Sequence, residues 1–456
     1  MGRRIYKSTG FLHRVVDIPD VSSTAYPDAK MRTVQGFGAL FHSVHMLYYY
    51  CCLYNIYINC MCFGLRCIPQ GSAFDKSPAP IGGQPMLFTV NVQMLLDGLN
   101  TVTRALAARP PKQILEGVLI EADDKSVTLT CSDGSLTIET HMDANVREEG
   151  RAVLPGKLFT ELCRKLPGGE VTVKVGENHV ASIKCMSFKS NLAGMNPMEY
   201  PEMAAVSAGV KVAIPQNQLR EMISRVVFAI ATDESRQILT GCLLEVAADE
   251  ARMVALDGFR LAIQKVFAPF ALPEGMDSLR AVIPGRVLSE LSKILAEDDE
   301  FCTLLIDKTR MQATFGDTTL STVLLAGEYI DYRRILPPSF KSVATANRLE
   351  VQSAIDRASL MAREGKNNLI RMSITGDEMS ITSNAELGDV LEVLGANLIG
   401  DPIEIAFNAK YITDVIRNIT DDEICMHFNS NVSPCVVSPM EGDQYLYLIL
   451  PVRVFS

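Results

Sequence analysis

The sequence lacks tryptophan altogether and carries only six histidines in 456 residues. Three histidines lie beyond residue 85, at His141, His179 and His427. None of them has a second histidine or a cysteine at a spacing typical of metal ligands. No glycine-rich phosphate loop follows an expected strand, and no serine stands in a nucleophile elbow. We therefore expect no catalytic group, no metal site and no cofactor. An unrecognised hydrolase would need residues that the sequence does not show.

Positive charge is also in short supply. Lysine and arginine total 43 against 53 aspartates and glutamates, so the formal net charge is −10. Such a balance argues against indiscriminate nucleic-acid binding, and any contact with phosphate must come from a local basic surface. Charged residues make up 21% and hydrophobic residues 48%, which indicates a globular protein. The length exceeds that of one hydrophobic core and suggests about three domains.

Paired cysteine motifs are missing from most of the chain. Seven of the twelve cysteines are scattered singly after residue 85, and none stands in CxxC spacing. We expect them to be small buried hydrophobic residues of a protein in a reducing compartment. They are Cys131, Cys163, Cys185, Cys242, Cys302, Cys425 and Cys435.

The first 85 residues differ in kind from the rest. No charged residue occurs from Thr33 to Leu65, and Ser72–Pro85 has the composition of a linker. We favour a functional protein that starts at Met86, preceded by a mis-assigned start or a dispensable leader. A targeting segment with basic residues upstream of the uncharged run is an alternative. A membrane anchor over residues 34–65 is another, because the run is long enough to span a bilayer.

One stretch occurs three times, at 152–166, 281–295 and, more divergently, 405–419. Relative to Pro155, Pro284 and Asn408, apolar residues recur three, four, seven and eleven positions later. This spacing predicts one narrow apolar stripe along a helix. The three stripes are Leu158, Phe159, Leu162 and Leu166; Val287, Leu288, Leu291 and Leu295; and Tyr411, Ile412, Val415 and Ile419.

Basic residues recur in the same three helices, two and nine positions after the anchor, on a face roughly opposite the stripe. They are Lys157, Arg164, Arg286, Lys293, Lys410 and Arg417. An acid lies between each pair of bases at pairing distance, namely Glu161, Glu290 or Asp414. A single copy would be an ordinary solvated face. Three copies in register predict one domain used three times, each presenting basic helices to a common anionic object.

The repeats lie about 125 residues apart and define the domain organisation. Each unit has the expected order strand, helix, strands, helix, strands. This order predicts an α+β domain with its helices gathered on one face of antiparallel sheets. We place the domains at 86–207, 208–340 and 341–456, after an extension at 1–85.

Four short motifs appear in a fixed order along the repeated part: MLFTV at 86–90, LDGFRLA at 256–262, DYRRILP at 331–337 and LPVR at 450–453. Together with the threefold repeat, they resemble the bacterial DNA polymerase III β subunit family, the sliding clamps. The resemblance covers residues 86–456. It implies three clamp domains forming half of a head-to-tail homodimeric ring, with the sheets outside and the helices lining the hole. It further implies a non-catalytic cytoplasmic processivity factor that encircles double-stranded DNA. The implied partners are the polymerase III α subunit, the clamp loader and other proteins with clamp-binding motifs.

The resemblance also implies site residues. For DNA contact it adds Arg109 and Arg236 to the six repeated bases. For the partner-peptide groove it implies Leu239, Leu256, Gly258, Phe259, Arg260, Leu261, Ile330, Arg334, Ile335, Leu448, Leu450, Pro451, Val452 and Arg453. For the dimer interface it implies apolar residues Leu192, Leu360 and Met361, with Lys189 facing Glu386, Asp389 or Glu392.

Within the groove we expect Leu256, Leu261 and Leu450 to line an apolar pocket. We expect Arg260 and Arg453 to stay at its rim with free charged heads, because neither has a reason to be buried. Leu256, Phe259 and Ile330 depart from common family residues and make the groove more apolar. A competing hypothesis is a membrane-tethered scaffold built on the same domains, with residues 34–65 as its anchor.

Overall fold

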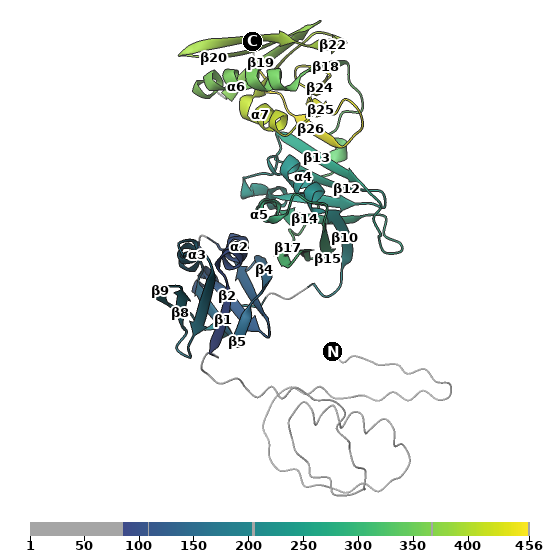
Figure 1. The fold of residues 1–456 in the computed structure, drawn as a ribbon. Helices are drawn as coiled ribbons and strands as arrows, with labels where there is room; N and C mark the ends of the chain where they lie inside the picture. Colours follow the sequence, from purple (N-terminus) through teal and green to yellow (C-terminus); the bar gives the residue numbers. More distant parts are fainter. Residues whose placement is uncertain (1–84, 108, 203–205, 366–367, 455–456) are drawn as a thin grey trace, which may run out of the picture. The chain divides into compact units, whose positions relative to one another are not determined.

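The computed structural model describes residues 85–107, 109–202, 206–365 and 368–454 (Figure 1). The expectations for the extension, including the leader, targeting and anchor hypotheses, therefore fall outside the described residues. Within those ranges, no helix is both long enough and apolar enough to cross a membrane.

Each of the three units opens with a strand that runs directly into an amphipathic helix. The pairs are β1 (Met86–Asn91) with α2 (Val92–Val102), β10 (Val210–Pro215) with α4 (Gln216–Val227), and β18 (Ser342–Asn347) with α6 (Arg348–Glu364). The Asn91 side chain accepts a hydrogen bond from the Gln93 amide, and the Asn347 side chain accepts one from the Glu350 amide. These bonds cap free backbone donors at the first turn and fix where each helix begins.

The repeated stretch forms a second helix in each unit, as the sequence predicts. These helices are α3 (Gly156–Arg164), α5 (Gly285–Ile294) and α7 (Ala409–Arg417). Each packs beside the first helix of its unit, giving the pairs α2–α3, α4–α5 and α6–α7 (Figure 1).

The predicted apolar stripe is correct for α5 and needs one correction in α3. In α5, Val287, Leu288 and Leu291 are all buried. In α3, by contrast, Leu158 is 55% exposed. The buried residues of α3 are Gly156, Phe159, Thr160 and Cys163. They stand three, four and seven positions from the first helical residue, so they form one face, and Leu158 lies outside it.

The strands form four antiparallel sheets. The first, of five strands, has the order β5 (Asn145–Glu148), β1, β7 (Glu170–Val175), β8 (Val180–Cys185), β9 (Phe188–Ala193). The second, of eight, has the order β10, β15 (Phe301–Ile306), β16 (Arg310–Phe315), β17 (Thr318–Val323), β4 (Leu136–Asp143), β3 (Ser126–Ser132), β2 (Gly117–Asp123), β6 (Gly150–Pro155).

The third sheet, of nine strands, has the order β14 (Leu279–Pro284), β11 (Gly241–Val246), β12 (Glu250–Leu256), β13 (Arg260–Phe267), β26 (Tyr445–Ile449), β25 (Cys435–Ser438), β24 (Glu423–Phe428), β18, β22 (Asn397–Ile399). The fourth has the order β21 (Gly388–Gly395), β20 (Glu378–Ala385), β19 (Leu369–Thr375), β23 (Ile403–Asn408).

Two of these sheets join neighbouring units. Strand β17 of the second unit pairs with β4 of the first, with Leu320 opposite Ile138. Strand β13 of the second unit pairs with β26 of the third, with Leu261 opposite Leu448. We call the β13–β26 pairing the seam. Backbone hydrogen bonds therefore link the units of residues 86–454 to one another.

Two hydrophobic clusters bear on function. The larger lies between the helices and the sheets, which confirms the α+β architecture. The smaller cluster lies about the seam and includes Leu256, Leu261, Tyr332 and Leu448, and we call it the seam cluster. The seven cysteines after residue 85 are buried and free, as expected. Burial raises the pKa of the Cys163 thiol to about 12, which makes it inert near neutral pH.

Candidate functional site

The six repeated bases all lie on the solvent side of their helices. Lys157 and Lys410 are exposed. The side chains of Arg164, Arg286, Lys293 and Arg417 are 50%, 49%, 52% and 53% exposed. This even exposure of about one half leaves every cationic head accessible to a large anionic surface.

The acids that neighbour these bases follow the predicted pairing in two helices out of three. Glu161 lies 3.6 Å from Arg164, and Glu290 lies 2.9 Å from Lys293. Asp414 instead binds Arg260, a residue 154 positions earlier in the chain. The prediction of an ion pair within α7 is therefore wrong, and Arg417 pairs with Asp356 of α6 at 2.8 Å.

The two further arginines implied for DNA contact, Arg109 and Arg236, are also exposed. Arg236 lies in the 3₁₀ segment η4 (Glu234–Thr240), where its φ of −125° and ψ of 77° break the helical geometry. Neither side chain forms an ion pair in the described part of the chain.

Two segments that are far apart in sequence, LDGFRLA and LPVR, meet at one end of the seam. The β12–β13 turn holds Gly258 at a φ of +93°, a conformation that side chains disfavour. In this turn the Asp257 carboxylate accepts hydrogen bonds from the amides of Phe259 and Arg260, at 2.8 and 3.0 Å. The Leu450 amide donates to the Phe259 carbonyl at 2.8 Å. The turn of LDGFRLA is thereby tied to the LPVR segment.

The third segment, DYRRILP, is attached through its 3₁₀ turn η5 (Tyr332–Arg334). The Tyr332 hydroxyl donates to the Glu245 carboxylate at 2.8 Å, and Arg333 contacts the same carboxylate at 2.9 Å. Burial raises the pKa of Glu245, but the hydrogen bonds and charges of Tyr332, Arg333 and Arg280 bring it below its usual value. Glu245 therefore holds η5 in place as an anion.

The groove residues separate into a buried floor and an accessible rim. Leu239, Leu256, Leu261 and Leu448 are between 1% and 3% exposed and belong to the seam cluster. Apart from Arg260, the remaining implied residues are half-buried or exposed: Gly258, Phe259, Ile330, Arg334, Ile335, Leu450, Pro451, Val452 and Arg453. Residues of all three motifs contribute to the seam cluster, namely Leu256 and Leu261, Tyr332, and Leu450.

Arg260 does not behave as predicted. Its side chain is 6% exposed, and its guanidinium binds Asp257 at 3.0 Å, Asp414 at 2.5 Å and the Phe228 carbonyl at 2.5 Å. It also lies over the Tyr411 ring, 4.8 Å from the centroid. The prediction of a free rim arginine is wrong for Arg260, because two carboxylates and a carbonyl compensate its burial. Arg453, by contrast, is exposed as expected.

Sequence reasoning missed the aromatic part of this arginine site. Phe259 is 56% exposed and stacks on Tyr411, with ring centroids 5.5 Å apart. The periodicity of α7 places Tyr411 in its apolar stripe, so the sequence does not indicate that its ring stacks on Phe259. The sequence offers one weak signal for the turn: Asp257 precedes Gly258 and stands three positions before Arg260, a pattern typical of a turn that an aspartate side chain caps.

The implied interface residues lie on two sheet edges and one helix. Lys189 and Leu192 are on β9, which ends the first sheet, and Leu192 is only 8% exposed and packs in its own core. On α6, Leu360 is 57% exposed and Met361 is half-buried. The acids Glu386 and Asp389 are exposed and lie in or beside β21, which ends the fourth sheet.

One member of the implied charged rim already has a partner. Glu392 forms a two-pronged ion pair with Arg357 at 2.7 and 2.6 Å. It is therefore less available to Lys189 than the other two acids, because a second base must share the same carboxylate.

A metal site in the described ranges would require several histidine, cysteine or carboxylate side chains grouped around one point. Within them, no group of three or more histidines, cysteines, aspartates or glutamates is arranged to hold a metal ion.

Comparison with known proteins gives one consistent result. The N-terminal, central and C-terminal domain families of the DNA polymerase III beta subunit match residues 86–204, 213–331 and 333–453. The beta sliding clamp of Staphylococcus epidermidis is 32% identical over 380 residues, which span 81% of this chain and 100% of that protein.

Solved structures agree with the sequence comparison. The DNA polymerase sliding clamp from Bacillus subtilis superposes with a TM-score of 0.78 at 32% identity, covering 81% of this chain and all of that one. The DNA polymerase III beta subunit from Thermotoga maritima gives 0.76 at 26% identity with the same coverage. The chain therefore belongs to the DNA polymerase III beta subunit family, the beta sliding clamps, which are non-catalytic processivity factors of DNA replication.

Proposed function

We propose that two copies of this chain close head to tail into a ring around double-stranded DNA and tether the replicative polymerase to it. We further propose domain boundaries at 86–207, 208–340 and 341–456. The observation that best supports ring closure is that two sheets of the described residues end in strands without an outer partner. Among the described strands, β9 and β21 each stand last in a sheet and have no partner on the outer edge.

The exposed residues around β21 suit burial by a second copy. Leu387, Leu391 and Val393 are 79%, 63% and 55% exposed, and Leu360 of α6 is 57% exposed. An accessible apolar edge strand is a template for pairing with another chain. The β9 edge offers Phe188 (37% exposed) and the base Lys189, opposite in charge to Glu386 and Asp389. Two different edges meeting in this way define a head-to-tail contact.

The eight exposed bases support loose contact with the DNA backbone. They are Arg109, Lys157, Arg164, Arg236, Arg286, Lys293, Lys410 and Arg417. Ion pairs with Asp133, Glu161, Glu290 and Asp356 partly neutralise four of them. Such a field holds the duplex without a tight phosphate clamp, so the ring slides.

The groove at the end of the seam is the proposed docking site for partner proteins. We expect an extended peptide with a leucine or phenylalanine anchor to insert over the seam cluster, between Leu450 and Ile330. Exposed Arg334 and Arg453 at the rim would bind peptide carbonyls or acids. The partners are the polymerase III α subunit, the clamp loader and other proteins with clamp-binding motifs. Family membership supports DNA and replication proteins as the partner classes.

The test combines ring formation with DNA retention. Native mass spectrometry of the full chain should give a dimer, and the loaded protein should stay on nicked circular DNA but slide off linear DNA. Equal retention on both substrates would contradict encirclement.

The groove has a separate test. Leu450→Asp should weaken binding of a fluorescent peptide ending in Leu-Phe at least tenfold while leaving the dimer intact, because a hot-spot anchor contributes about 2 kcal/mol or more. Leu349→Asp, at a 58% exposed leucine on α6, is the matched control. Undiminished binding by the Leu450 variant would refute the groove.

We propose the cytoplasm as the location, since chromosomal DNA is the expected substrate of a clamp. The membrane-tethered scaffold makes the opposite prediction for the full chain. Recovery in the membrane fraction after a high-salt wash would favour the scaffold, and recovery in the supernatant would favour the cytoplasmic clamp.

A further inference from the structure

The seam has a second end, and a pocket lies there. The groove adjoins the pair Arg260–Ile449, whereas the last pair at the other end is Gln264–Tyr445. At that end a pocket of about 770 Å³ opens between α4, the end of β13, the loop after α7 and the β25–β26 loop. We call it the seam pocket. It takes residues from both the second and the third domain.

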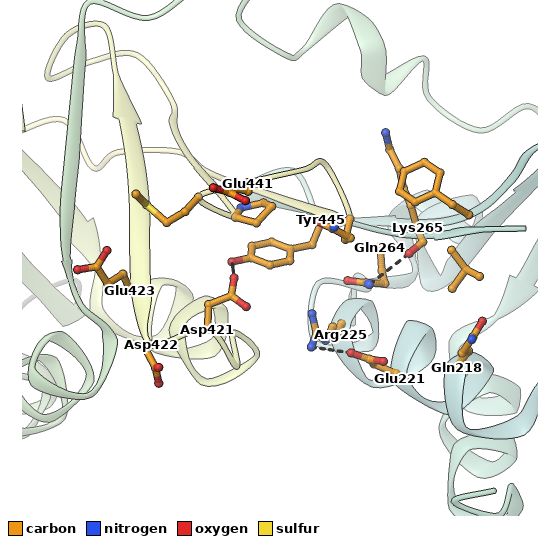
Figure 2. A pocket seen from close by; sticks show the side chains of 15 residues that line it. Gln218, Glu221, Arg225, Gln264, Lys265, Asp421, Asp422, Glu423, Glu441 and Tyr445 are labelled. Atoms are coloured by element: carbon orange, nitrogen blue, oxygen red, sulfur yellow. Dashed lines mark hydrogen bonds and ion pairs between the residues drawn. The ribbon is translucent and has the colours of Figure 1, made fainter. Parts of the chain in front are cut away.

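The lining of the seam pocket is strongly acidic. It includes five carboxylates, from Glu221, Asp421, Asp422, Glu423 and Glu441, against two bases, Arg225 and Lys265. Figure 2 shows Asp421 and Glu441 on one side of the opening and the Arg225–Glu221 pair on the other.

Both bases are already engaged. Arg225 binds Glu221 at 2.6 Å and the Thr420 hydroxyl at 2.9 Å, and Lys265 binds Asp443 at 2.5 Å. In the described part of the chain, Asp422, Glu423 and Glu441 form no ion pair. The negative charge of the pocket is therefore not neutralised from within.

An unsatisfied buried acceptor marks the inner wall. Gln264 is 5% exposed, and its Oε1 atom is buried without any hydrogen-bond partner. Its Nε2 donates to the Lys265 carbonyl at 3.4 Å, which fixes the amide orientation because a flip would bring two oxygens together. Gln264 lines the pocket, and Figure 2 places its side chain between Tyr445 and Arg225. A buried acceptor of this kind calls for a donor.

Two exposed apolar side chains also line the pocket. Phe267 and Met440 line it and are 53% and 51% exposed. The Tyr445 hydroxyl further in is already committed, since it donates to Asp421 at 2.5 Å. Exposed apolar side chains, five carboxylates and a buried acceptor together match a side chain with an aliphatic stem and a cationic head that only donates.

We propose that the seam pocket binds an arginine or lysine side chain of a partner protein, which docks at the opposite end of the seam from the groove. The stem would pack on Phe267 and Met440, and the head would lie between Asp421 and Glu441 and donate to Gln264. Because the part of the groove at Leu256 and Leu450 lies at the other end of this strand pairing, two partners can occupy the two sites at once. The proposal does not depend on ring closure.

The test uses the full chain and a fluorescein-labelled peptide, acetyl-Gly-Arg-Gly-Arg-Gly, followed by fluorescence anisotropy. A peptide with citrulline in place of arginine has nearly the same shape without the charge and is the ligand control. The arginine peptide should bind and the citrulline peptide should not. Asp421→Asn with Glu441→Gln should weaken binding about fivefold or more.

Two further variants separate the pocket from the overall charge of the molecule. Glu170→Gln with Glu177→Gln removes two exposed acids of the first domain and should change binding less than twofold. Gln264→Leu removes the orphan acceptor, so it should weaken binding while leaving the thermal midpoint unchanged or higher. Equal loss in the two acid-pair variants, wild-type binding by Gln264→Leu, or no binding of the arginine peptide at all would each overturn the proposal.

Discussion

The buried Arg260 site makes the sharpest prediction about stability. The guanidinium joins Asp257 of the β12–β13 turn to Asp414 of α7, and it also holds the Phe228 carbonyl at the end of α4. The second and third domains therefore share one ion-pair network. Replacing Arg260 by leucine keeps the bulk of the stem but leaves two acids without their base.

The size of the effect follows from what remains. Breaking a fully buried ion pair costs about 3–5 kcal/mol. Here Asp414 is 26% exposed and regains some hydration, and Asp257 keeps its two backbone hydrogen bonds. We therefore expect Arg260→Leu to lower the free energy of unfolding by about 2–3 kcal/mol.

A double-mutant cycle checks the assignment. Arg260→Leu, Asp414→Leu and the double variant are unfolded in guanidinium chloride and followed by far-UV circular dichroism, with the cycle applied to the transition that reports the seam. We expect a coupling energy of about 1–2 kcal/mol between the two residues. The exposed pair Arg220–Glu297, with side chains 39% and 80% exposed, is the control and should give less than about 0.5 kcal/mol.

One pattern of results would refute this reasoning. If the Arg260–Asp414 coupling is no larger than the control while Arg260→Leu abolishes binding of the groove peptide, the arginine acts as a free rim residue. The original expectation from the sequence would then be right.

Three other changes have defined outcomes. Replacing Leu360 and Met361 with lysine should give a monomer of half the dimer mass in native mass spectrometry, and a persistent dimer at low concentration would move the interface elsewhere. Changing Lys157 or Arg286 alone should weaken DNA retention less than about threefold, whereas changing both with further repeated bases should weaken it much more. A single change that abolishes retention would instead indicate a discrete phosphate site. Glu245→Gln should lower stability by about 1–2 kcal/mol at pH 7. Because the folded-state pKa of Glu245 is lowered, its contribution is present above about pH 4.5 and is lost as the pH falls through the folded value, so the variant and wild type should converge in acid denaturation.

The repeated domain was predictable because its signal is local. The strand–helix beginnings at β1–α2, β10–α4 and β18–α6 follow from hydrophobic periodicity within about twenty residues of chain, and asparagine caps add to it at α2 and α6. The exposure of Leu158 is not explained by where the helix begins, since α3 and α5 both begin one residue after their proline and the equivalent Val287 is buried.

The site was predictable in outline and not in its contacts. The order of the motifs indicates the family, and the resemblance to that family implies that the three groove segments lie in one site. No local pattern could indicate that Asp414 binds Arg260 rather than a neighbour on α7, because the partner is 154 positions away and burial decides the competition. The unpartnered Oε1 atom of Gln264 likewise results from packing between segments that are distant in sequence, so no local pattern indicates it.

The sheets that cross the domain borders have a mechanical consequence. Five residue pairs span the border at β13–β26, and five span the border at β4–β17. Hydrogen bonds in such a ladder share an applied load, so the borders resist being pulled apart far better than flexible linkers would. Under load, the three domains of one copy are therefore expected to move together rather than independently. A molecule that opens a closed ring of this protein would therefore separate the contacts between copies before it separated the domains of one copy.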